Sequence, residues 1–108
     1  MTHYLLSQIQ LKYGVANQAR FQAAMVTVQG FFESQNINLV ASTVTRVGSL
    51  YEIFNLWEME DEGHHQRAMN SISPDDPNAR AALAELAAVI EHEQLRFLET
   101  LPIGHASH

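Results

Sequence analysis

The hydrophobic and polar positions of residues 3–13 alternate, which predicts a first strand. One of its faces carries Leu5, Ser7, Ile9 and Leu11. Beyond Gly14 the hydrophobic spacing changes to three and four residues, as in an amphipathic helix. The resulting stripe consists of Phe21, Met25, Val28 and Phe32. We therefore expect a strand followed by a helix over residues 15–34.

Residues 37–47 and 50–58 predict two further strands joined as a hairpin at Gly48 and Ser49. The first is rich in Val, Thr and Ile, which favour strands. In the second, alternation places four residues on one face: Tyr51, Ile53, Asn55 and Trp57. The helices need an apolar sheet face to pack on, so we expect this face to point towards them.

The next segment predicts two helices with a break between them. Acidic residues 60–62 suit the start of a helix that ends near Ser71, because they complement its positive end. Asp76 followed by Pro77 is a second start signal, opening a helix over residues 77–90. Residues 71–76 are expected to form a loop.

Residues 90–101 fit either a continuing helix or a fourth strand. A three-stranded sheet with an exposed edge would be weak in a chain of 108 residues, so we favour the strand. The order β-α-β-β-α-α-β then predicts an α+β fold: a ferredoxin-like antiparallel sheet with helices on one face. Residues 1–103 form one domain, and residues 104–108 are expected to form a flexible tail.

The opposite face of the sheet carries Leu6, Phe54 and Leu56, which no helix of the same chain would cover. Apolar patches of this kind usually bind another surface, so we expect a sheet-to-sheet homodimer, as in a dimeric α/β barrel.

Composition narrows the class of partner and compartment. A net charge of −6 disfavours nucleic-acid binding, because phosphate backbones are repelled. The absence of cysteine excludes a disulfide framework and a thiol nucleophile. The sequence shows neither a membrane-spanning apolar run nor a signal-peptide pattern, so we expect a cytoplasmic protein without a membrane partner.

Four residues of the predicted sheet are candidates for binding a small organic ligand. Trp57 and Tyr51 would wall a cleft between sheet and helices, as amphipathic aromatic rings often do. Asn55 is polar on an apolar face, and Ser7 is expected to lie across from it, so the two could orient a carbonyl or hydroxyl group. The alternatives are that Trp57 is an ordinary core residue and that Asn55 and Ser7 satisfy each other.

His64 and His65 are the candidate catalytic residues, because a histidine is well suited as a general base near neutral pH. Neighbours on a helix point about 100° apart, so only one of them can face the cleft. A solvated helix face is the alternative interpretation. A metal site would need three convergent ligands, which we do not find, and no phosphate-binding loop or nucleophile motif is present. We therefore expect neither metal nor cofactor.

Weak motifs spread over residues 4–102 together resemble the NIPSNAP family of the dimeric α/β-barrel superfamily. On the first strand the matching residues are Tyr4, Leu6, Leu11, Lys12 and Gly14. On the hairpin they are Gly48, Leu50, Ile53, Leu56 and Trp57, followed by Glu60 and Asp61. Ser7 and Asn55 depart from the pattern, since the family often has a basic residue and a histidine there.

The resemblance implies the fold and a homodimer, whereas the family has no common established reaction. Relatives in the superfamily include cofactor-independent monooxygenases, haem-degrading enzymes, isomerases and cyclases. Haem degradation is not expected, because Ser7 and Arg67 stand where those enzymes have asparagine and the haem-ligating histidine. The resemblance suggests a small-molecule cleft for a cofactor-independent oxygenase, isomerase or cyclase acting on an aromatic or polyketide-like compound. The alternative is a non-catalytic module for small-molecule binding or protein interaction.

Overall fold

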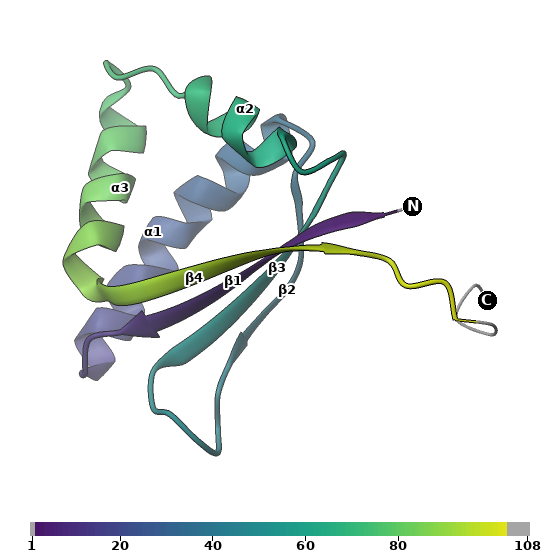
Figure 1. Cartoon of the computed structure of the whole chain (residues 1–108). Coiled ribbons are helices and arrows are strands. Elements are labelled where there is room, and N and C mark those ends of the chain that lie inside the picture. Colours follow the sequence, from purple (N-terminus) through teal and green to yellow (C-terminus); the bar gives the residue numbers. More distant parts are fainter. Residues whose placement is uncertain (1, 104–108) are drawn as a thin grey trace.

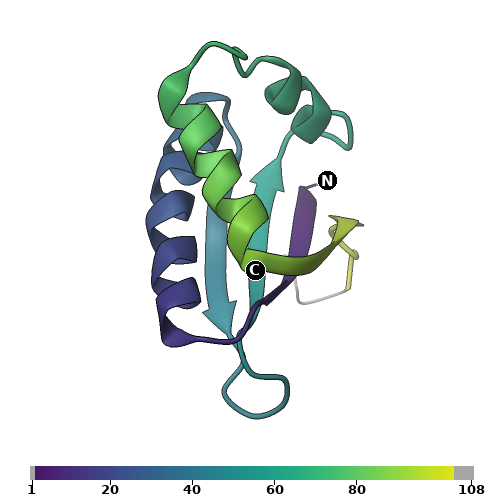
Figure 2. The ribbon, with the colours of Figure 1, turned by 90° about the vertical axis from the view of Figure 1, so that its left-hand side faces the viewer.

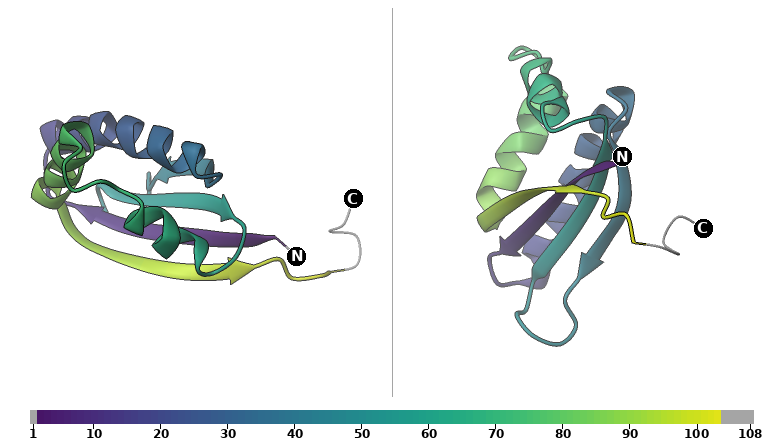
Figure 3. Two further views of the ribbon diagram at one scale, coloured as in Figure 1. Left: turned by 90° about the horizontal axis from the view of Figure 1, so that it is seen from above. Right: turned by 45° about the vertical axis from the view of Figure 1, so that its right-hand side comes forward.

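The computed structural model describes residues 2–103 and has the predicted order of strands and helices. Its elements are β1 (His3–Leu11), α1 (Val15–Ser34), β2 (Asn38–Val44), β3 (Glu52–Met59), α2 (His64–Asn70), α3 (Pro77–Val89) and β4 (Ile90–Glu99). Helices α1 and α3 lie on one face of the sheet and leave the other face uncovered (Figures 1 and 3). The α+β, ferredoxin-like prediction is confirmed.

The sheet is antiparallel throughout, with the strand order β2-β3-β1-β4. Residues 90–99 form a strand paired along β1, which confirms the choice of strand over helix. Helix α3 passes directly into this strand (Figure 2). The register places Ser7 between Asn55 of β3 and Leu95 of β4, and Leu5 between Trp57 and Phe97. Side chains from three strands therefore meet on the face below the helices.

The core forms where the alternating face of β1 meets the helices. One buried cluster consists of Leu5, Phe32, Ile37, Trp57, Met59 and Ala68. The other consists of Ile9, Leu11, Phe21, Ile53 and Val89. Arg20 of α1 and Glu85 of α3 join the two helices by two hydrogen bonds of 2.8 Å each. This ion pair lowers the pKa of the Glu85 carboxyl, chiefly through its hydrogen bonds to the guanidinium.

The loop between α2 and α3 is confirmed. Asp76 caps α3 by accepting hydrogen bonds from the backbone N–H groups of Asn78 and Ala79, and Pro77 opens the helix. The start of α2 differs from the prediction, because the acidic residues 60–62 precede the helix. Asp61 instead accepts hydrogen bonds from the Gly63 N–H and from Arg67, which holds these residues in a turn.

Several strand boundaries also differ from the prediction. β1 ends at Leu11 rather than Tyr13, β2 spans Asn38–Val44 rather than residues 37–47, and β3 spans Glu52–Met59 rather than residues 50–58. β4 ends at Glu99 rather than at residue 101. No helix among residues 2–103 is long and apolar enough to cross a membrane. The predicted tail, residues 104–108, lies outside the described residues.

Candidate functional site

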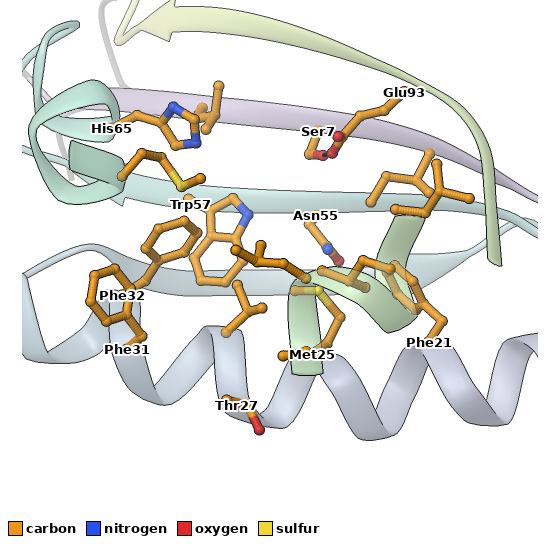
Figure 4. Close-up of a pocket in the computed structure, with 18 of the residues that line it drawn as sticks. Ser7, Phe21, Met25, Thr27, Phe31, Phe32, Asn55, Trp57, His65 and Glu93 are labelled. Carbon is orange, nitrogen blue, oxygen red and sulfur yellow. Dashed lines mark hydrogen bonds between the residues drawn. The ribbon is translucent and has the colours of Figure 1, made fainter. Parts of the chain in front are cut away.

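A cavity of about 400 Å³ lies between the sheet and the helices, and its lining is mostly apolar. Its walls come from β1, β3 and β4 on one side and from all three helices on the other. Figure 4 shows the side chains that point into it. Apolar cavities with a few polar groups are the usual binding sites for small organic molecules.

Trp57 forms part of the cavity wall, as its place on the inner face of β3 predicts. It is 3% exposed, and its ring forms a T-shaped pair with that of Phe32, with ring centres 5.0 Å apart and planes at 86°. Trp57 is therefore a core residue on one side and a cavity-lining residue on the other (Figure 4). Its position agrees with both interpretations, and ligand binding by Trp57 stays a prediction.

Asn55 supplies a polar group to the cavity. It is 1% exposed, and its Oδ1 accepts a hydrogen bond of 2.5 Å from the Ser42 hydroxyl. Its Nδ2 has no hydrogen-bond partner among residues 2–103. Every fully buried side-chain nitrogen or oxygen in that range has a partner, so Nδ2 is not fully buried. The Asn55 amide nitrogen is thus accessible from the cavity and free to donate to a ligand.

Ser7 lies opposite Asn55 in the sheet, but the two side chains do not bond to each other. The Ser7 hydroxyl, in a residue that is 4% exposed, donates instead to a carboxylate oxygen of Glu93 at 2.5 Å. Glu93 reaches it from β4 and is exposed at the cavity. Asn55 therefore bonds to a residue of β2 and Ser7 to a residue of β4, and the two do not bond to each other.

Glu93 is the site residue that sequence reasoning did not select. It lines the cavity beside Ser7 (Figure 4). Residues 90–101 were predicted to be a strand, but residues 91–99 are all exposed, so no alternation in burial marks the face of β4 that turns towards the helices. Among the described residues that line the cavity, it is the only carboxylate and the only ionisable group besides His65.

Of the two candidate histidines, only His65 lines the cavity. Its ring lies 5.8 Å from the ring of Phe32, measured between centres. Burial lowers the pKa of His65, and the negative charge of Glu93 opposes this effect only in part. The imidazole is therefore largely neutral at pH 7 and can accept a proton or a hydrogen bond.

His64 is not positioned for catalysis in this cavity. It is 7% exposed, and its Nδ1 accepts a hydrogen bond of 3.0 Å from the Glu60 N–H. Its Nε2 lies 2.6 Å from the carbonyl oxygen of Gln35, so Nε2 carries the proton. Nδ1 thus bonds to the turn before α2 and Nε2 to the residue that ends α1, so both ring nitrogens are in use and this position gives no support to the predicted catalytic role of His64.

Tyr51 does not line the cavity either. Its φ of 59° places it in the left-handed region, in the turn before β3, so the alternation of that strand does not extend to it. Its ring packs edge-on against Tyr13, with centres 5.5 Å apart. The expectation that Tyr51 walls the cleft is therefore not supported by its position.

No group of three or more His, Cys, Asp or Glu side chains in the described range 2–103 is arranged to hold a metal ion. The lining residues whose side chains carry polar atoms are Ser7, Thr27, Asn55, Trp57, His65 and Glu93. They offer hydrogen-bond donors and acceptors at separate points of an apolar wall.

Comparison with solved structures identifies the fold. A NIPSNAP family protein from Agrobacterium tumefaciens has a TM-score of 0.75 at 17% identity, over 96% of this chain and 95% of its own. A NIPSNAP domain protein from Burkholderia xenovorans has a TM-score of 0.73 at 16% identity, over 94% and 95%. SnoaB, a cofactor-independent oxygenase from Streptomyces nogalater, has a TM-score of 0.66 at 14% identity, over 95% and 96%.

These likenesses agree with the resemblance drawn from the sequence motifs. At such low identity they establish a shared fold and carry no activity over to this chain. No protein-family model and no curated protein sequence matches the chain.

Proposed function

We propose that this protein is a NIPSNAP-like homodimer that binds a small, mostly apolar ring compound in the cavity of each subunit. The observation that carries the proposal is the cavity itself, in which the edge of a buried Trp57 and the free amide N–H of Asn55 share one apolar wall. A flat ring suits the apolar wall, and a carbonyl or hydroxyl oxygen suits the Asn55 donor.

The residues around the cavity support a cofactor-independent reaction on an aromatic or polyketide-like compound. Asn55 Nδ2 would hold an oxygen of the substrate, and it would favour a form in which that oxygen gains negative charge. The neutral imidazole of His65 would accept a proton, because burial keeps its pKa low. An oxygenase, an isomerase and a cyclase can all begin with such a proton transfer.

Binding can be tested through Trp57, because it is the only tryptophan of the chain. Titration with neutral two- and three-ring aromatic ketones should change its fluorescence in a saturable way. Asn55→Ala should weaken binding about five- to tenfold, the usual effect of losing one hydrogen bond. Asn38→Ala, an exposed amide outside the cavity, is the matched control. The proposal fails if no compound of this class gives a saturable change.

Turnover is tested on the compounds that bind, in air and without added cofactor. An oxygenase would consume dissolved oxygen and add oxygen mass to the product. An isomerase would change the retention of the compound at constant mass, and a cyclase that eliminates water would lower the mass. His65→Gln should slow any of these reactions more than it weakens binding, because the proposed role is proton transfer.

The proposed homodimer rests on the uncovered face of the sheet. Leu6 lies between Leu56 of β3 and Arg96 of β4, and Phe54 extends the same face. Light scattering should give twice the mass of one chain. Leu56→Lys should lower that mass at micromolar concentration, whereas Val26→Lys, on an exposed position of α1, should not. A monomer for the unaltered chain would contradict the dimer.

A non-catalytic binding protein is the second candidate. The observation that favours it is that Ser7 and Glu93 bond to each other, and Ser42 already occupies Asn55 Oδ1. An acid and a base therefore do not converge on one point of the cavity. Saturable binding of many compounds without any product would support this candidate over the enzyme.

A further inference from the structure

The charge that the cavity lining carries is of one sign, negative. Its lining residues within the described chain include neither lysine nor arginine, and Glu93 is their only acidic member. His65 is the other ionisable group, and burial lowers its pKa, so it brings little positive charge at pH 7. A ligand inside this cavity thus meets a single negative charge, that of the exposed Glu93 carboxylate.

Glu93 is held at this position by a buried hydroxyl. Ser7 is 4% exposed and gives its only hydrogen to one carboxylate oxygen of Glu93. Glu93 belongs to neither of the two ion pairs found in the described part of the chain, which join Arg20 to Glu85 and Arg67 to Asp61. The carboxylate is therefore oriented by the sheet and its charge has no protein cation beside it.

Asn55 adds an independent sign that this end of the cavity receives a polar group. Only 1% of its surface is exposed, yet its Nδ2 has no hydrogen-bond partner in the described range 2–103. The register places Asn55 next to Ser7, which bonds Glu93. The donor on β3 and the carboxylate on β4 thus lie on either side of β1, at the sheet side of an apolar cavity (Figure 4).

We infer that the cavity selects its ligand by charge: it takes a hydrophobic amine whose ammonium group pairs with Glu93, and it rejects organic acids. The inference rests on the proposed function, since it specifies the ligand of the same cavity. The ring of the amine lies along the apolar wall that includes Trp57, and its ammonium group reaches Glu93 where the carboxylate is exposed. A carboxylate ligand would lose its hydration without gaining any cation.

Isothermal titration with three ligands of matched shape tests the inference: naphthylmethylamine, naphthylmethanol and naphthylacetate. The amine should bind about tenfold more tightly than the alcohol, the usual gain from a hydrogen bond to a charged group. The acid should bind at least about tenfold more weakly than the alcohol, because of repulsion and desolvation.

Variants of the full-length chain assign this preference to Glu93. Glu93→Gln keeps the shape of the side chain, and we expect it to bind amine and alcohol equally. Glu99→Gln is the matched control, since Glu99 is exposed at the end of the same strand and does not line the cavity. It should keep the tenfold preference. Ser7→Ala should reduce the preference, because the carboxylate loses its positioning hydrogen bond.

The outcomes separate this inference from the proposed function. Equal binding of amine and alcohol by the unaltered chain overturns the inference but leaves the small-molecule cavity intact. So does a preference for the amine that survives Glu93→Gln. If none of the three compounds binds, the inference fails, whereas the proposed function is decided by the titration with aromatic ketones.

Discussion

Replacing Trp57 by alanine probes the double role of this side chain. The residue is 3% exposed, belongs to the cluster around Leu5 and Ile37, and forms a T-shaped ring pair with Phe32. It also borders the cavity. The substitution therefore removes core contacts on one side and extends an existing empty space on the other.

The size of the effect follows from this geometry. Truncating a buried aromatic residue to alanine costs about 3–5 kcal/mol, from lost transfer free energy and from the space left behind. The part of Trp57 that faces the cavity of about 400 Å³ has few neighbours to lose, so we expect the low end, about 3 kcal/mol. For a domain of this size that lowers the Tm by at least about 12 °C.

Urea unfolding followed by circular dichroism measures this loss, because the variant has no tryptophan left to report by fluorescence. Trp57→Phe should lose less, since a ring still packs against Phe32. A loss under about 1 kcal/mol would refute the packing described for Trp57. A loss beyond about 5 kcal/mol would show a side chain enclosed on all sides, with no room for a ligand beside it.

Three further outcomes are expected. His64→Ala should lower the free energy of unfolding by about 1–3 kcal/mol without changing ligand affinity, because the Glu60 N–H and the Gln35 carbonyl lose their partner. An unchanged urea unfolding curve would contradict this prediction. Burial holds the pKa of His65 below 6.5, so the folded state binds fewer protons than the unfolded state, and the free energy of unfolding should fall as the pH drops through 6.5. His65→Gln should flatten that part of the plot of unfolding free energy against pH. Asp76→Ala should cost about 1 kcal/mol by removing the cap of α3, measured as a fall in Tm.

Alternation predicted the sheet well because one face of each inner strand is buried. Leu5, Ser7, Ile9 and Leu11 all lie below the helices. A register error of one residue would turn this whole set towards solvent, which is why the pattern was informative. The placement of Ser7 opposite Asn55 followed from the same alternation and the expected strand order.

The ends of elements were predicted less well, because local hydrogen bonds decide them. Tyr51 has the right parity for the inner face of β3, but its left-handed backbone belongs to the turn. Asp61 was expected in a helix, yet its carboxylate is used by Gly63 N–H and Arg67 before the helix begins. Both choices depend on partners that periodicity does not describe.

One part of the candidate site could be predicted from the sequence, and another part could not. Asn55 and Trp57 share a face by parity within a single strand, so two residues of a clear pattern sufficed to predict them. Glu93 enters the site only because residues 90–99 leave α3 as a strand and pair with β1, where Ser7 meets its carboxylate. The same residues as a helix would have kept Glu93 away from Ser7. The charge that the cavity presents is thus a consequence of the fourth strand, and it exists only in the folded sheet.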